Sequence, residues 1–161
     1  MLTLLMFGLF LLMCNLKGGS YGDFEKIIVF ADSTIYEEIR PFLEETFDQF
    51  IYTPHEERRF YLDLQPIELL NTYKMRRNLI FLGLLSGQDQ TSQYIQKALT
   101  SELQQAIKDG KVFPIVKEDL FATDQIVYFL SAHELAVLKE SIKNYSTELF
   151  KKLDKFHFKS L

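Results

Sequence analysis

Two acidic loop segments are the first candidates for ligand chemistry in this 161-residue chain. Asp32-Ser33-Thr34 and Ser86-Gly87-Gln88-Asp89 each follow a short apolar run with the composition of a buried strand. Ligands of α/β folds enter beyond the carboxyl ends of parallel strands, so neighbouring strands would bring both segments to one crevice. The residues of this predicted crevice are Asp32, Ser33, Thr34, Ser86 and Asp89.

A structural role is the simpler explanation of the same residues. Asp, Ser and Thr side chains commonly cap the first turn of a helix, and a Ser-Gly-Gln-Asp segment is typical of a turn. Helical periodicity resumes after both segments. On the sequence alone, capping is therefore the favoured explanation, and a pocket shared by the two loops would favour the crevice.

No catalytic or metal-binding motif accompanies these loops. The histidines His55, His133 and His157 are widely spaced, and none has a metal-ligating neighbour at helical spacing. Gly83 and Gly87 lack the lysine and the third glycine of a phosphate-binding loop. We therefore predict no catalytic residue, no metal and no cofactor, and an enzyme is the less favoured interpretation.

Cys14 is a second candidate for chemistry, as a site of lipidation. It is the only cysteine, and it ends an apolar run that begins at Leu2. As a helix this run would span roughly 18 Å, against the roughly 30 Å hydrocarbon core of a membrane. That length is typical of a signal peptide, so we expect residues 1–14 to be an export signal with a lipobox-like end.

The same segment leaves two cleavage sites open. Leu11 supplies the branched apolar residue of a lipobox, whereas Met13 is larger than the small residue expected before the cysteine. Gly18 and Ser20 fit ordinary signal cleavage after Ser20. A lipid anchor on the outer side of a membrane is the leading expectation, and secretion to the periplasm is the alternative.

Composition limits what the rest of the chain can be. The formal net charge of −4 gives no reason to expect a nucleic-acid partner. The 15 Phe and eight Tyr indicate a core rich in rings, and with Cys14 as the only thiol the core forms without a disulfide. We expect residues 15–23 to be a tether and residues 24–161 to be one α/β domain.

Apolar runs alternate with helical patterns along the predicted domain. Strands are expected at 26–31, 59–64, 78–85 and 125–130, and Pro114 confines a further extended segment at 112–116 to an edge. The pattern predicts a mostly parallel or mixed sheet of about four strands with helices on both faces. A ferredoxin-like arrangement, with helices on one face, is the alternative.

Four helices are expected between and after these strands. They run from Thr34 to about Phe50, over 67–74, from Thr91 or Ser92 to Asp109, and from about His133 onward. Thr34 and Glu37 fit a capping box at the start of the first helix. Pro41 is expected to kink that helix or to divide it.

Several segments resemble an uncharacterised family of bacterial lipoproteins, designated domain of unknown function 4837. They are the cysteine-ending signal, the strand at 25–32, the loop with Pro54 and Glu57, and the segments 73–80 and 124–127. The pair Arg77-Asn78 and the segment 122–125 are the most specific points, and the likeness covers about residues 20–150. The resemblance implies export and lipidation at Cys14, and it implies no activity.

The leading expectation is therefore a lipid-anchored cell-envelope protein whose α/β domain binds or scaffolds another envelope component. Its expected partners are a membrane, through the lipid on Cys14, and another envelope protein. The alternative is an exported small-ligand-binding protein or enzyme that uses the crevice near Asp32 and Asp89.

Overall fold

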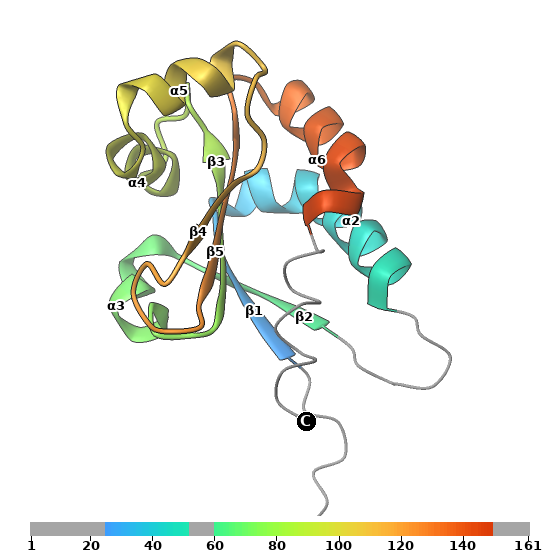
Figure 1. Cartoon of the computed structure of the whole chain (residues 1–161), viewed down its shortest axis with the longest axis vertical. Coiled ribbons are helices and arrows are strands. Elements are labelled where there is room, and N and C mark those ends of the chain that lie inside the picture. Colours follow the sequence, from blue (N-terminus) through green and yellow to red (C-terminus); the bar gives the residue numbers. More distant parts are fainter. Residues whose placement is uncertain (1–24, 52–59, 150–161) are drawn as a thin grey trace, which may run out of the picture.

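The computed structural model describes residues 25–51 and 60–149, and five strands form one mixed sheet within them (Figure 1). The strand order is β2-β1-β3-β5-β4, in which the first four are parallel and β4 is an antiparallel edge. The strands are β1 (Glu25–Phe30), β2 (Phe60–Gln65), β3 (Asn78–Leu84), β4 (Ile115–Glu118) and β5 (Ile126–Ala132). The α/β prediction is confirmed, and the expected edge segment near Pro114 supplies the fifth strand.

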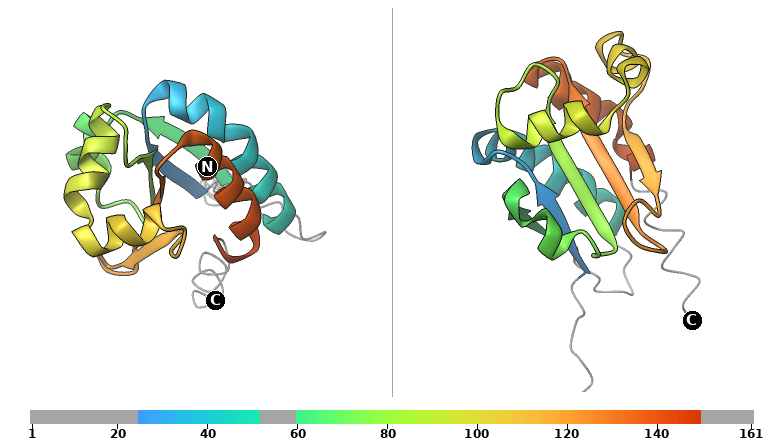
Figure 2. Two further views of the ribbon diagram at one scale, coloured as in Figure 1. Left: turned by 90° about the horizontal axis from the view of Figure 1, so that it is seen from above. Right: turned by 90° about the vertical axis from the view of Figure 1, so that its left-hand side faces the viewer.

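Helices cover both faces of this sheet, as Figures 1 and 2 show. One face carries α2 (Ser33–Ile51) and α6 (Leu135–Leu149). The other face carries the short 3-10 helix η1 (Ile67–Leu69) and the helices α3 (Leu70–Tyr73), α4 (Gln90–Ala98) and α5 (Ser101–Lys108). The predicted arrangement with helices on both faces is confirmed, and the ferredoxin-like alternative, with helices on one face, is wrong. None of the described helices is long and apolar enough to cross a membrane.

The central strands β1, β3 and β5 send alternate side chains into two cores, one on each face of the sheet. On the α4 side, Phe30, Phe81 and Phe129 lie in register on three adjacent strands. Their ring centroids are 5.1 and 5.0 Å apart, and Tyr94 of α4 adds a fourth ring 4.9 Å from Phe81. This stack supplies the ring-rich core that the composition indicates, and it ties α4 to the centre of the sheet.

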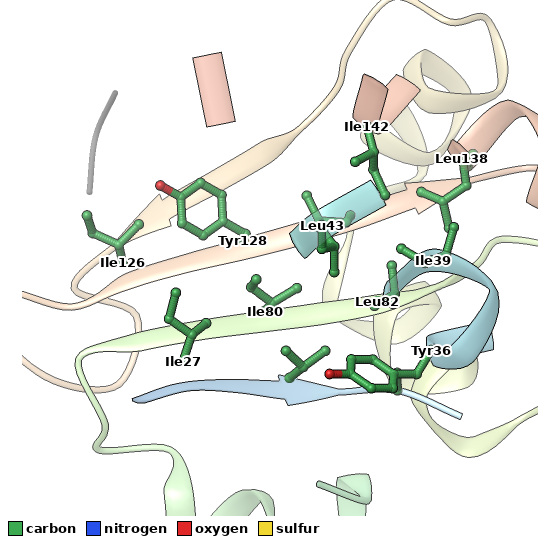
Figure 3. Close-up of a cluster of buried hydrophobic side chains, with 14 residues drawn as sticks. Ile27, Tyr36, Ile39, Leu43, Ile80, Leu82, Ile126, Tyr128, Leu138 and Ile142 are labelled. Atoms are coloured by element: carbon green, nitrogen blue, oxygen red, sulfur yellow. The ribbon is translucent and has the colours of Figure 1, made fainter. Parts of the chain in front are cut away.

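The second core lies under α2 and α6 (Figure 3). Ile39 and Leu43 of α2 and Ile142 of α6 pack there over alternate residues of the strands. Tyr128 of β5 lies in this core with 2% of its surface exposed. Burial raises the pKa of the Tyr128 phenol, with Glu118 adding in the same direction, so the group stays protonated at physiological pH.

The start of α2 differs from the prediction. Asp32, not Thr34, is the capping residue, because its Oδ1 accepts hydrogen bonds from the backbone N–H groups of Thr34 at 2.9 Å and of Ile35 at 3.4 Å. The predicted division at Pro41 is also wrong, since α2 runs unbroken from Ser33 to Ile51.

The predicted helix from Thr91 or Ser92 to Asp109 is two helices, not one. The chain is extended at Leu99, and the hydroxyl of Thr100 accepts a hydrogen bond from Leu103 N–H to start α5. Gln104 bridges the break, because its Nε2 donates to the carbonyl oxygens of Gln96 and Leu99. The predicted stop at Asp109-Gly110 is confirmed: α5 ends at Lys108, Asp109 is its C-cap, and the φ of 67° at Gly110 is a left-handed conformation that glycine adopts without strain.

Candidate functional site

The order of the strands creates a crossover at the carboxyl ends of β1 and β3. From β1 the chain passes outward through α2 to β2, and from β2 it returns through α3 to β3 on the other side of β1. The loops that follow β1 and β3 therefore leave toward opposite faces of the sheet (Figure 2). In doubly wound folds this divergence opens a crevice where ligands bind.

A pocket of about 530 Å³ lies at this crossover. Its walls come from three strand ends that are distant in the sequence. After β1 they are Ala31, Asp32 and Ser33; from β2 and the turn after it, Leu64, Pro66, Ile67 and Glu68; and after β3, Asp89, Gln90 and Thr91. The volume lies within the range of roughly 300–1,000 Å³ that is usual for small-molecule sites.

Three of the five residues that sequence analysis assigned to a crevice line this pocket: Asp32, Ser33 and Asp89. Thr34 is in the first turn of α2, and Ser86 is used elsewhere. The Ser86 hydroxyl donates to the His133 carbonyl oxygen at 2.6 Å, which connects the loop after β3 to the end of β5. The two acidic loops thus meet in one pocket, and not every residue of each loop lines it.

Both aspartates of the pocket also cap helices. Asp32 caps α2, and the Oδ1 atom of Asp89 accepts the Ser92 backbone N–H at 2.8 Å to cap α4. The two residues therefore combine capping, the favoured explanation of the sequence, with a position in the wall of a shared pocket. Because capping fixes the position of each carboxylate, the pocket has charged groups that are already oriented.

Close packing of α4 against β3 positions the third wall. The Ser92 hydroxyl is fully buried and accepts the Leu84 backbone N–H at 2.9 Å. A Cβ atom on Gly83 would lie 2.8 Å from the Ser92 Oγ and 2.9 Å from the Ile95 Cδ1. One on Gly87 would lie even closer to the Ser92 Oγ. Two glycines therefore allow the first turn of α4 to reach the strand and hold Asp89 at the pocket.

The charged side chains around the pocket have one sign. Asp32, Glu68 and Asp89 are acidic, and no lysine, arginine or histidine is among the described residues that line it. Within the same described part of the chain, no three His, Cys, Asp or Glu side chains are arranged to hold a metal ion. The arrangement offers carboxylate and hydroxyl acceptors beside an apolar surface.

The wall that β2 contributes was not predicted from the sequence. Leu64, Pro66, Ile67 and Glu68 follow the same pattern as the other walls, a strand followed by the start of a helix. The signal was present, because Pro66 marks a helix start after a strand. What the sequence lacked was the position of β2 beside β1, which depends on contacts between distant segments.

The opposite end of the sheet has a second polar feature, which we name the Gln125 junction (Gln125, Lys74, Arg76 and Phe121). The Gln125 side chain is buried, and its Nε2 donates to the carbonyl oxygens of Lys74 and Arg76, both at 2.6 Å. Its Oε1 accepts the Phe121 backbone N–H at 3.0 Å. One amide thus connects the segment before β3 to the loop before β5.

Several predicted residues lie outside the described residues: Cys14 with its signal segment, the tether at 15–23, His55 and His157. His133 is exposed at the start of α6.

Comparison with known proteins gives a family and no relative of known activity. No curated protein and no solved structure matches the chain. The resemblance to the lipoprotein family is not tested by these comparisons and stays a prediction. One family model matches residues 20–161, which is most of the chain, and the protein therefore belongs to the family described as Domain of unknown function (DUF8532).

Proposed function

We propose that this domain binds a small molecule in the pocket at the carboxyl ends of β1, β2 and β3. The observation that carries the proposal is the position of the pocket, at the crossover where doubly wound sheets bind their ligands. Its volume of about 530 Å³ suits a molecule of metabolite size.

The lining supports binding in a defined orientation. The apolar part of the lining comes from Leu64, Pro66 and Ile67 of the β2 region. The carboxyl and hydroxyl groups come from residues that follow β1 and β3: Asp32, Ser33, Asp89 and Thr91. We propose binding and not catalysis, because Asp32 and Asp89 are held by the first turns of α2 and α4. A carboxylate fixed in this way is suited to orienting a ligand.

We also propose that the domain works at the cell envelope, anchored through a lipid on Cys14. The support is the apolar run before Cys14 and the polar, glycine-containing segment at 15–23, which suits a tether. Release to the periplasm after cleavage at Ser20 is the alternative. A second envelope protein is a further proposed partner, which the tether would let the domain reach.

The pocket is tested by filling it. Ser33→Phe places a ring at an exposed first residue of α2 that lines the pocket. Ser101→Phe is the matched control, because Ser101 is the exposed first residue of α5 and does not line the pocket. The measurement is a titration of the full chain with small ring compounds that carry a hydroxyl, carboxyl or amino group, followed by amide NMR shifts.

The expected result is binding that shifts the amides of residues 31–33, 67–68 and 89–91. The affinity should fall at least tenfold in Ser33→Phe and stay unchanged in Ser101→Phe. Equal binding by both variants, or no shift of these amides with any compound, would contradict the proposed pocket.

The anchor is tested separately. Cells that express the chain are labelled with a fatty-acid analogue, and Cys14→Ala is compared with the original sequence. Loss of label in the variant is expected. Label that persists in the variant would remove the proposed lipid, and absence of label in both chains would favour secretion.

A further inference from the structure

We infer that the ligand of this pocket is an organic cation, an ammonium or guanidinium group on an apolar body. This inference rests on the proposed function and adds the chemical class of the ligand. The lining of the pocket combines acidic side chains that follow three different strands, Asp32, Glu68 and Asp89, with the apolar residues Leu64, Pro66 and Ile67 of the β2 region.

The first step is the charge of the pocket. Asp32, Glu68 and Asp89 each bring a full negative charge. The helix N-termini of α2 and α4 oppose this with only about half a positive charge each. With no basic side chain among the described lining residues, the pocket is net negative and attracts a positive ligand.

The second step concerns phosphate, the ligand that helix N-termini at this position of the fold usually bind. Here the backbone N–H groups of Thr34 and Ser92 already donate to the carboxylates of Asp32 and Asp89. A phosphate would have to displace both carboxylates and then lie beside Glu68. The pocket therefore has the position at which such folds bind the phosphates of a nucleotide, but its acidic side chains favour a positively charged ligand over a phosphate.

The third step is the set of acceptors that remains for a ligand. Among the described residues, the hydrogen bonds of Asp32 and Asp89 reach only the Oδ1 atom, so each Oδ2 keeps its hydrogen-bonding capacity. Glu68 is exposed and has no ion-pair or hydrogen-bond partner in that part of the chain. A cation with several N–H donors would complete these acceptors, while its hydrocarbon part packs on Leu64 and Ile67.

The test uses three probes that share one ring and differ in charge: cyclohexylmethylamine, cyclohexylmethanol and cyclohexanecarboxylate. Each is titrated into the full chain at pH 7 and low salt, with amide NMR shifts of residues 31–33, 67–68 and 89–91 as the readout. We expect the amine to bind at least tenfold more tightly than the alcohol, and the carboxylate to leave these amides unshifted.

Charge-removing variants sharpen the result. Asp32→Asn and Asp89→Asn keep the ability to cap a helix, because asparagine caps about as well as aspartate. Glu68→Gln removes the third charge at a residue with no capping role. Each should weaken the amine severalfold and leave the alcohol unchanged, whereas Glu140→Gln, on the exposed surface of α6, should change neither.

The outcomes separate this inference from the proposed function. Alcohol or carboxylate binding in the pocket as tightly as the amine would overturn the cationic ligand and leave the binding function standing. Variants that weaken the amine and the alcohol equally would also overturn it, because the carboxylates would then act through structure. If none of the three probes shifts the pocket amides, the proposed function fails as well.

Discussion

Polar groups are used differently at the two ends of the sheet. At the amino ends of β3 and β5, the Gln125 junction directs both amide donors and the amide oxygen to backbone groups. At the carboxyl ends of β1 and β3, Asp32 and Asp89 use one oxygen each for a helix cap, and both residues line a pocket.

This difference indicates that the polar groups at the amino ends of the strands stabilise the fold, whereas those at the carboxyl ends are suited to binding a ligand. A buried amide with its partners satisfied holds two segments together and has nothing left for a ligand. A capping carboxylate is equally well positioned, yet only one of its two oxygens takes part in the cap. The following predictions test whether the two ends differ in this way.

The largest effect is expected at the Gln125 junction. Gln125→Leu leaves the carbonyl oxygens of Lys74 and Arg76 and the N–H of Phe121 without their partner, which should cost about 3 kcal/mol of unfolding free energy. Urea unfolding measures this loss. Gln105→Leu is the control, because the Gln105 side chain bonds only the exposed Asp109. A loss below about 1 kcal/mol would show that the junction is not structural.

Gln125→Glu adds a pH signature to the same prediction. A carboxylate cannot donate to two carbonyl oxygens, so the folded state should raise the pKa of the new side chain above its unfolded value. The variant should therefore gain stability as the pH falls toward 4 relative to Gln125→Leu, which has no group to titrate there. Parallel pH profiles of the two variants would contradict this.

The next largest effect concerns the wall that α4 builds. Gly83→Ala puts a Cβ atom against the Ser92 hydroxyl and the Ile95 side chain, which should cost about 2 kcal/mol. Because α4 must shift, this variant should also weaken fragment binding in the pocket. Gln125→Leu, once folded, should bind fragments normally. Equal effects of both variants on binding would erase the distinction between the two ends.

Substitution of two buried serines near the carboxyl ends of the strands, Ser131 and Ser92, should change the unfolding free energy in opposite directions. Ser131 pairs with Gly83 across the sheet, and its hydroxyl has no hydrogen-bond partner among the described residues. Ser131→Ala should therefore stabilise the protein by about 1 kcal/mol, because it removes an unpaired polar group. Ser92→Ala should destabilise by a similar amount, because Leu84 N–H loses its acceptor. Thermal unfolding of both variants decides whether the signs differ.

The smallest effect lies outside both ends, between α2 and α6. Lys139 donates to Glu38 and holds the pKa of that carboxyl below its usual value. The contribution of this pair is therefore present above about pH 4.5, the unfolded value, and is lost as the pH falls through the lower folded pKa. Lys139→Met should reduce the pH dependence of the unfolding free energy in that acidic range only. At neutral pH the variant should lose less unfolding free energy than Ser92→Ala, because the Lys139–Glu38 pair is exposed, and a larger loss would contradict this.

Local patterns predicted most of the fold because burial decides it. The strands at 78–84 and 126–132 are apolar on both faces, and in a domain of this size such runs must enter the sheet. The break near Thr100 was missed because the apolar stripes of α4 and α5 continue the same periodicity. A threonine inside a helix and a capping threonine look alike until its hydrogen bond to Leu103 is known.

The sequence predicted those residues of the candidate site that directly follow an apolar strand, and it did not predict those whose place depends on how the strands pair. Asp32 and Asp89 were placed together because parallel neighbours bring their following loops to one edge. Glu68 was missed, since its place in the pocket depends on which strand β2 pairs with. Gln125 was also missed as a structural residue, because a glutamine before a strand has no local pattern that distinguishes a buried amide from an exposed one.

The crossover between β1 and β3 has a consequence for how the sheet opens. Every residue of β1 pairs with β2 and all of β3 pairs with β5, whereas the β1–β3 pairing is limited to Ile28–Phe30 and Leu79–Phe81. The loops that follow β1 and β3 line the pocket. A molecule that contacts both loops would connect the two strands beyond their short pairing. It should therefore slow amide hydrogen exchange in the β1–β3 pairing more than elsewhere in the sheet.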